Sequence, residues 1–167
     1  EDIIPLKKSF KVSFSIPKMD SLKSAQSFIG KFDLKGKSRF LSNKIKNGVL
    51  EGSSKTLGKF MIFRDSIAPE ILPINFKNKQ WLSNYNFLKF KIDDDFTGIK
   101  SYRGELDGQW VLLEYEPKNK TLIYDLNDLT SDKALHQLTI KAEDLVGNKT
   151  EYSIEFYRKN KIFIISN

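Results

Sequence analysis

The sequence contains no cysteine and only one histidine, His136. Without cysteine the chain can form no disulfide framework, no thiolate zinc site and no cysteine nucleophile. With one imidazole it cannot build a hydrolytic zinc site that needs several histidine ligands. Packing and hydrogen bonding alone must therefore hold the fold together, and two common routes to hydrolytic chemistry are excluded.

Other chemical signatures are also missing. No apolar stretch approaches the roughly 20 residues that span a bilayer, and the run Ile162–Ile165 has the length of a strand. The glycines follow no phosphate-binding or dinucleotide pattern, and no Gly-x-Ser-x-Gly elbow occurs. The chain opens Glu1-Asp2-Ile3-Ile4, without an initiating methionine or a signal peptide. We expect a fragment or processed product with no active site and no transmembrane segment.

Charge and aromatic type both change at one place in the chain. From Glu1 to Ile67 there are 14 lysines and arginines against 6 acidic residues, whereas the rest has 14 against 15. All six tyrosines and both tryptophans lie in the second part. Such a shift predicts a small basic module at residues 1–66 and a second module at 67–158, followed by a strand or tail at 159–167. The junction Asp65–Ile71 is too short and apolar for a free tether.

The dominant hydrophobic period is two, which is typical of strands with one buried face. From Lys8 to Ile16 the residues Phe10, Val12, Phe14 and Ile16 alternate with polar ones, and Pro17 closes the run. Weaker strands are predicted at Gln26–Phe32, Arg39–Leu41, Gly48–Leu50 and Gly58–Phe63. Five short strands in so few residues predict a small or truncated first module.

The second module has sharper alternation. Seven strands are predicted, at Glu70–Phe76, Leu88–Ile92, Tyr102–Leu106, Trp110–Tyr115, Thr121–Asp125, Leu138–Ala142 and Tyr152–Phe156. The pairs Asp107-Gly108 and Gly147-Asn148 stand between strands, where turns need residues that tolerate positive φ. The predicted fold class is all-β, with two small immunoglobulin-like β-sandwich modules in tandem.

Two acidic loops are expected at the same end of the second sandwich. Their candidate calcium ligands are Asp94, Asp95, Asp144 and Asn148, because calcium takes six to eight oxygen ligands and extracellular modules bind it weakly. Alternatively, Asp144 caps its own turn and the Asp93–Asp95 run is merely solvated. We favour this second interpretation, and the sequence indicates no other cofactor.

The remaining chemistry-bearing side chains have structural explanations. His136 starts a strand on the inward-facing parity, about 26 Å from Asp144, which favours a hydrogen-bonded histidine at the core edge. Trp81, Trp110 and Tyr102 could stack on a sugar, but large aromatic residues in a sandwich are usually core residues. The phenylalanines of the basic module fall on strand parity, so nucleic-acid binding is not expected. Its lysines form a solvated face or meet an anionic polymer or partner.

Several short motifs occur in the order seen in bacterial extracytoplasmic immunoglobulin-like domains. They are Asp65-Ser66-Ile67-Ala68-Pro69, residues 95–102 (DFTGIKSY), residues 106–110 (LDGQW), His136-Gln137-Leu138 and residues 144–148 (DLVGN). The series resembles the non-catalytic region after the peptidase domain in envelope zinc endopeptidases of the LytM or lysostaphin type, which cut peptidoglycan cross-bridges. The similarity is best from Asp65 to Phe156, and residues 54–60 are the only reminiscent stretch before it. The family's metal ligands, a His, a downstream Asp and a His-x-His pair, have no counterparts here.

This resemblance implies a periplasmic or cell-surface location and a non-catalytic accessory region. Such a region would position or regulate a peptidoglycan endopeptidase, with a cell-wall polymer or a catalytic domain of the same chain as its partner. The alternative is a free-standing surface adhesin or carbohydrate-binding module whose aromatic residues stack on sugar. Full burial of Trp81 and Trp110 would argue against this alternative, because a sugar-binding aromatic residue must be accessible.

Overall fold

The structure, a computed structural model, describes residues 5–16, 21–33 and 35–159, and nearly all of its regular elements are strands. The predicted all-β sandwich fold class is confirmed. The chain divides into two compact units. Unit 1 comprises Glu1–Pro69, Asp94–Lys100 and Glu143–Lys149, and unit 2 comprises Glu70–Asp93, Ser101–Ala142 and Thr150–Asn167. Unit 1 therefore includes two loops from the predicted second module, while most of the predicted tail at 159–167 lies outside the described residues.

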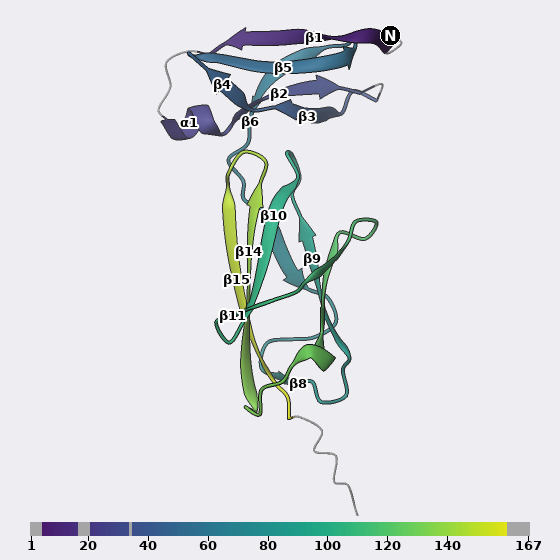
Figure 1. The fold of residues 1–167 in the computed structure, drawn as a ribbon, viewed down its shortest axis with the longest axis vertical. Helices are drawn as coiled ribbons and strands as arrows, with labels where there is room; N and C mark the ends of the chain where they lie inside the picture. Colours follow the sequence, from purple (N-terminus) through teal and green to yellow (C-terminus); the bar gives the residue numbers. More distant parts are fainter. Residues whose placement is uncertain (1–4, 17–20, 34, 160–167) are drawn as a thin grey trace, which may run out of the picture. The chain divides into compact units, whose positions relative to one another are not determined.

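In its described residues, unit 1 has two three-stranded sheets and one short helix (Figure 1). One sheet has the order β1-β5-β4, with bounds Pro5–Ser15, Val49–Thr56 and Lys44–Lys46. The other has the order β3-β2-β6, with bounds Ser38–Ser42, Ser27–Phe32 and Phe60–Arg64. All five predicted strands are present, whereas β4 and helix α1 (Ser21–Ala25) were not predicted, because neither carries an alternating apolar pattern.

The core of unit 1 lies where β1 and β5 pack on β2. Val12, Ile29 and Leu50 are its buried residues. Partly buried side chains pack against them, including Phe10, Phe14, Ile16, Leu41, Phe60 and Ile62. Full burial of one large apolar side chain contributes about 1.5–3 kcal/mol. This cluster of buried residues is small, as the predicted size of the module implies.

Aromatic packing joins the loop 94–100 to unit 1. Phe96 meets the rings of Phe28 and Phe63 edge-on, at centroid distances of 5.1 and 5.4 Å. The Phe63 ring lies over Gly30, where an added Cβ would come within 2.5 Å of it. Phe28 itself is completely buried. The loop is therefore part of the folded body of unit 1.

Unit 2 contains a four-stranded and a five-stranded sheet (Figure 1). The first has the order β12-β13-β9-β7, with bounds Glu114–Glu116, Thr121–Asp125, Phe87–Asp93 and Glu70–Pro73. The second has the order β11-β10-β14-β15-β8, with bounds Gln109–Val111, Ile99–Leu106, Leu135–Asp144, Lys149–Tyr157 and Gln80–Trp81. A 3-10 turn covers Leu126–Asp128. When the short edge strands β8 and β11 are set aside, the remaining strands have the ABED (β7-β9-β13-β12) and CFG (β10-β14-β15) arrangement of an immunoglobulin-type sandwich.

In the strands of unit 2, alternating apolar and polar residues face the core and the surface in turn, as the sequence predicts. Leu88, Phe90 and Ile92 are fully buried, and the intervening lysines are exposed. The hairpin between β10 and β11 turns at Asp107 and Gly108, with φ of 50° and 82°, so both central residues adopt the left-handed conformation of a type I′ turn. Among the helices in the described part of the chain, none is long and apolar enough to cross a membrane.

Candidate functional site

The five-stranded sheet of unit 2 has one buried face and one exposed face. Along β14, His136, Leu138 and Ile140 are buried, while the residues between them face outward. Trp110 stands directly opposite Glu105 across the β10–β11 pair. Trp81 stands opposite Tyr157 across the β15–β8 pair. Both tryptophans therefore belong to the exposed face, which we call the outer face.

Trp81 and Trp110 are 54% and 59% exposed. The prediction that large aromatic residues here would be core residues is wrong, because each indole is carried by a short edge strand instead of a buried central one. β8 and β11 form the two edges of the sheet. Four strand spacings of about 4.8 Å place these edges about 19 Å apart. The outer face thus presents two accessible indoles with a broad polar surface between them.

Local contacts fix the position of Trp81. Its ring stacks on Tyr157 with a centroid distance of 5.1 Å and an interplanar angle of 26°. The backbone N–H of the next residue, Leu82, donates to the Tyr157 carbonyl at 2.8 Å. The buried guanidinium of Arg158 donates from Nη1 to the carbonyls of Leu82 and Tyr85, at 3.0 and 2.6 Å. β8 is therefore held by a charged clamp, although it is only two residues long.

The hairpin that carries Trp110 is also tied down. Oδ1 of Asp107 accepts a hydrogen bond from the Gln137 backbone N–H at 2.9 Å, and Oδ2 lies 2.8 Å from His136 Nδ1. His136 is 1% exposed, so its prediction as a hydrogen-bonded residue at the core edge is confirmed. Within the described part of the chain its Nε2 atom has no hydrogen-bond partner.

Ordered polar side chains occupy the outer face between the tryptophans. Glu105 accepts hydrogen bonds from Arg103 at 2.8 Å and from Lys141 at 3.0 Å. These two bonds lower the pKa of Glu105, and the bond to Glu105 raises the pKa of Lys141. The hydroxyl groups of Thr139 and Ser153 lie 2.8 Å apart. The surface therefore offers hydroxyl, carboxylate and cationic groups in fixed positions.

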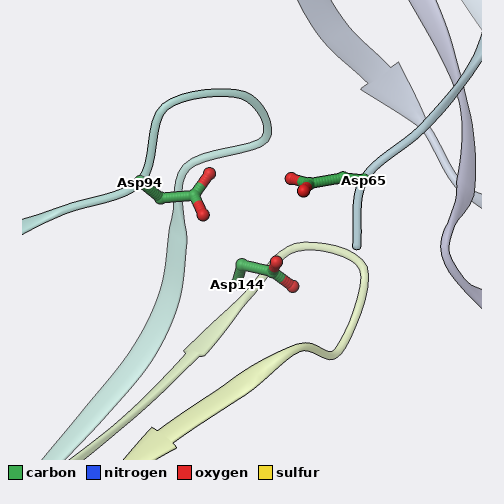
Figure 2. Close-up of side chains that lie close together, drawn as sticks. All are labelled: Asp65, Asp94 and Asp144. Atoms are coloured by element: carbon green, nitrogen blue, oxygen red, sulfur yellow. The ribbon is translucent and has the colours of Figure 1, made fainter. Parts of the chain in front are cut away.

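Three carboxylates converge in unit 1, and Figure 2 shows them pointing toward one another. They belong to Asp65, Asp94 and Asp144, and one oxygen of each lies within 4.8 Å of the others. Two of them were among the predicted calcium ligands. Asp95 is exposed and is not part of the group. Asp65 was not predicted, because it lies far from the other two in sequence and no local motif relates it to them.

Each carboxylate is engaged by its own turn. Oδ2 of Asp94 accepts from the backbone N–H groups of Thr97 and Gly98, at 2.8 and 2.7 Å. Oδ1 of Asp144 accepts from the backbone N–H groups of Val146 and Asn148, at 2.9 and 2.8 Å. The interpretation that Asp144 caps its turn is confirmed. The expectation of a merely solvated acidic run is wrong for Asp94, because this side chain organises the loop.

Asn148, the fourth predicted ligand, contacts the group through its amide nitrogen. Nδ2 donates to Asp144 Oδ2 at 2.7 Å and to the Asp65 carbonyl at 3.1 Å, while Oδ1 accepts from Gln26 Nε2 at 2.6 Å. The three carboxylates supply hard oxygen ligands, but fewer than the six to eight that calcium takes. Calcium binding by Asp94, Asp95, Asp144 and Asn148 stays a prediction.

Unit 1 also has an open groove of about 500 Å³. Its lining residues are Lys31, Phe32, Asp33, Lys35, Arg39, Phe40 and Leu41. Backbone N–H groups, chiefly that of Lys37, lower the pKa of Asp33, which also lies 3.4 Å from Arg39. The groove combines cationic and apolar walls, and its role as a face for an anionic polymer stays a prediction.

No protein-family model matches the chain, and no curated protein matches it. Among solved structures, it is similar to the fibronectin(III)-like modules of Clostridium thermocellum CbhA, at 10% identity and a TM-score of 0.42, covering 93% of this chain and 88% of that one. It is also similar to a mutant Clavibacter michiganensis expansin in complex with cellohexaose, at 12% identity and a TM-score of 0.36. The apo form of that expansin gives 14% identity and a TM-score of 0.35. Both expansin alignments cover 80% of this chain and 69% of the other. At these values the likenesses carry no information about function.

Proposed function

We propose that this chain is a non-catalytic binding region of a bacterial extracytoplasmic protein, and that the outer face of unit 2 holds a cell-wall polysaccharide. The observation that carries the proposal is the exposure of Trp81 and Trp110, at 54% and 59%, on one face of one sheet. Tryptophan is enriched at binding interfaces, because its indole ring offers a large apolar surface together with an N–H donor.

The chemistry of the outer face suits a sugar chain. A pyranose ring has apolar C–H faces, which stack on an indole, and a rim of hydroxyl groups, which exchange hydrogen bonds with polar side chains. Glu105, Thr139 and Lys141 supply such groups between the indoles. The separation of about 19 Å between the sheet edges favours an extended polymer over a single sugar, because only a chain reaches both indoles.

Two lines of reasoning support a non-catalytic role at the cell envelope. The sequence lacks the cysteine, histidine and glycine patterns of the common hydrolase sites. The motifs between Asp65 and Phe156 resemble the region that follows the catalytic domain in LytM-type zinc endopeptidases. On this proposal the polysaccharide-binding region keeps a peptidoglycan endopeptidase close to its substrate, in the periplasm or at the cell surface.

Sedimentation with purified peptidoglycan sacculi tests the binding function. We expect the chain to sediment with sacculi, and Trp81→Ala and Trp110→Ala each to weaken binding by about tenfold, since a hot-spot aromatic residue contributes 1 kcal/mol or more. Phe87→Ala is the matched control, because Phe87 is 42% exposed but belongs to the four-stranded sheet. Its affinity should equal that of the wild type.

Two results would contradict this proposal. One is a chain that stays in solution with every insoluble glycan, and the other is equal binding by the wild type and the double variant Trp81→Ala, Trp110→Ala. The link to an endopeptidase has a separate test, which is the intact mass and N-terminal sequence of the native polypeptide. A native chain that carries a histidine-bearing peptidase domain supports it, and one without such a domain favours a free-standing adhesin or carbohydrate-binding module.

A further inference from the structure

A cavity of about 300 Å³ lies beside Trp110 in unit 2. Its walls come from the β10–β11 hairpin, from β13 with the following 3-10 turn, and from the loop that leads to β14. The lining residues are Leu106, Asp107, Gln109, Trp110, Val111, Tyr124, Asp128, Leu129, Thr130, Ser131 and Lys133. This volume is at the lower end of the range for ligand pockets. It therefore suits one sugar residue or its substituent rather than a stretch of polymer.

Tyr124 places a hydroxyl group on the cavity wall. The residue as a whole is 1% exposed, and its hydroxyl group makes no hydrogen bond to a described residue but stays accessible from the cavity. Burial, followed by the charges of Asp128 and Asp125, raises the pKa of Tyr124 to about 12, so the phenol keeps its proton at neutral pH. A hydroxyl group that faces a cavity and has no protein acceptor is available to donate to a ligand.

Two carboxylates and three apolar side chains complete the chemistry of the cavity. Asp107 is fixed by His136 and Gln137, and each carboxylate oxygen has a second lone pair for a ligand donor. Asp128 supplies another acceptor. The apolar side chains of the lining are Leu106, Val111 and Leu129, of which Leu106 and Leu129 are each 7% exposed. The cavity thus combines the Tyr124 hydroxyl group and other polar side chains with carboxylate acceptors and an apolar surface.

We infer that this cavity takes the acetamido group of an N-acetylated amino sugar, while Trp110 at its wall stacks on the sugar ring. The acetamido carbonyl accepts from the Tyr124 hydroxyl, its N–H donates to the carboxylate of Asp107 or Asp128, and its methyl group contacts Leu106 and Leu129. This inference rests on the proposed function and names its ligand class: the glycan bound by the outer face is N-acetylated.

The test compares two soluble hexaoses by isothermal titration calorimetry. Chitohexaose and cellohexaose have the same β-linked backbone, but only chitohexaose carries acetamido groups. We expect the wild type to bind chitohexaose at least about tenfold more tightly, since a site built for a polar group rejects the analogue without it. Tyr124→Phe, which removes one hydroxyl group, should reduce this preference to about twofold.

Two further variants sharpen the result. Tyr115→Phe is the matched control, because Tyr115 is exposed on β12 and does not line the cavity, and it should keep the full preference. Trp81→Ala should weaken binding of both hexaoses without changing their ratio. Thermal unfolding of each variant shows that it is folded.

The outcomes separate this inference from the proposed function. Equal affinity of the wild type for the two hexaoses, or an unchanged preference in Tyr124→Phe, overturns the acetamido assignment. If Trp81→Ala still weakens binding in that case, the proposed polysaccharide-binding function stands. If neither hexaose binds, the assignment is also overturned, and sedimentation with sacculi then decides the proposed function by itself.

Discussion

Nδ1 of His136 lies 2.8 Å from Oδ2 of Asp107, and this contact joins the start of β14 to the β10–β11 turn. Asp107 has positive φ and accepts the Gln137 N–H through its other oxygen. The single histidine of the chain therefore holds the hairpin that carries Trp110. Because its ring also packs on Phe156 at a centroid distance of 5.4 Å, it is at the same time a core residue.

We expect His136→Ala to lower the free energy of unfolding by about 2–4 kcal/mol, because it leaves a cavity beside Phe156 and removes a partner of Asp107. Urea unfolding followed by circular dichroism measures this change. Gln137→Ala, at an exposed neighbouring position, serves as the control and should change stability by less than about 0.5 kcal/mol. A loss below 1 kcal/mol in His136→Ala would mean that the contact contributes little.

The raised pKa of Tyr124 predicts a loss of stability at alkaline pH. The value is about 12 in the folded chain against 10.0 for the free group. The stabilisation is therefore complete below pH 10 and is lost as the pH rises toward 12, because the unfolded chain releases this proton first. Two pKa units correspond to on the order of 2–3 kcal/mol. Unfolding in urea at pH 9 and pH 11.5 should show this decline in the wild type and a smaller one in Tyr124→Phe.

Tyr152 is the internal reference for this measurement, because its pKa is raised by burial as well. Tyr152→Phe should reduce the loss of stability at alkaline pH only by the contribution of Tyr152 itself. If Tyr124→Phe and the wild type lose the same stability between the two pH values, Tyr124 is not the buried phenol that the geometry indicates.

The adjacent residues Asp94 and Asp95 should differ sharply in their effect on stability. Asp94 accepts hydrogen bonds from Thr97 and Gly98, whereas Asp95 is exposed. We expect Asp94→Ala to lower the free energy of unfolding by about 1–3 kcal/mol and Asp95→Ala by less than about 0.5 kcal/mol. Thermal and urea unfolding measure these changes. If the two variants lose the same stability, the loop does not depend on the Asp94 carboxylate.

Calcium binding by the three converging carboxylates has its own test, which compares Asp95→Ala with Asp144→Ala. If Asp65, Asp94 and Asp144 hold the ion, calcium should raise the melting temperature of the wild type by an amount that grows with its concentration. This shift should persist in Asp95→Ala and disappear in Asp144→Ala. Magnesium at the same concentration controls for ionic strength, and equal shifts with both ions would exclude a specific calcium site.

The sequence predicted most strands because burial on one face imposes a period of two. Residues 88–92 illustrate this, since their three apolar members are fully buried and their two lysines exposed. β8 was not predicted, because two residues are too few to show an alternating hydrophobic pattern. It forms because Arg158 and the Tyr157 carbonyl bind the following segment, and such contacts depend on residues more than 70 positions away.

The candidate site was less predictable. Residue type alone placed Trp81 and Trp110 in the core, because most large aromatic residues of a sandwich are buried. Their exposure follows from edge-strand positions and from register, which pairs Trp110 with Glu105 and Trp81 with Tyr157. Asp65 likewise joins Asp94 and Asp144 only through tertiary structure. The alternating pattern carries information about which face of a strand is buried, but not about which strands become edges.

Arg158 gives the sharpest test of how the outer face is held. Its buried guanidinium donates to the carbonyls of Leu82 and Tyr85, at 3.0 and 2.6 Å. Arg158→Met keeps much of the volume but leaves both carbonyls without this donor. We expect the free energy of unfolding to fall by about 2–4 kcal/mol, and binding to sacculi to weaken, because β8 no longer holds Trp81 against Tyr157.

Lys159→Ala is the control for this variant. Lys159 is exposed, and its substitution removes one positive charge from the position next to Arg158. It should bind as the wild type does. Trp fluorescence separates stability from positioning. A folded Arg158→Met variant with a red-shifted emission and weaker binding shows that the clamp orients Trp81, whereas unchanged emission and full binding would show that stacking on Tyr157 is sufficient to hold the indole in place.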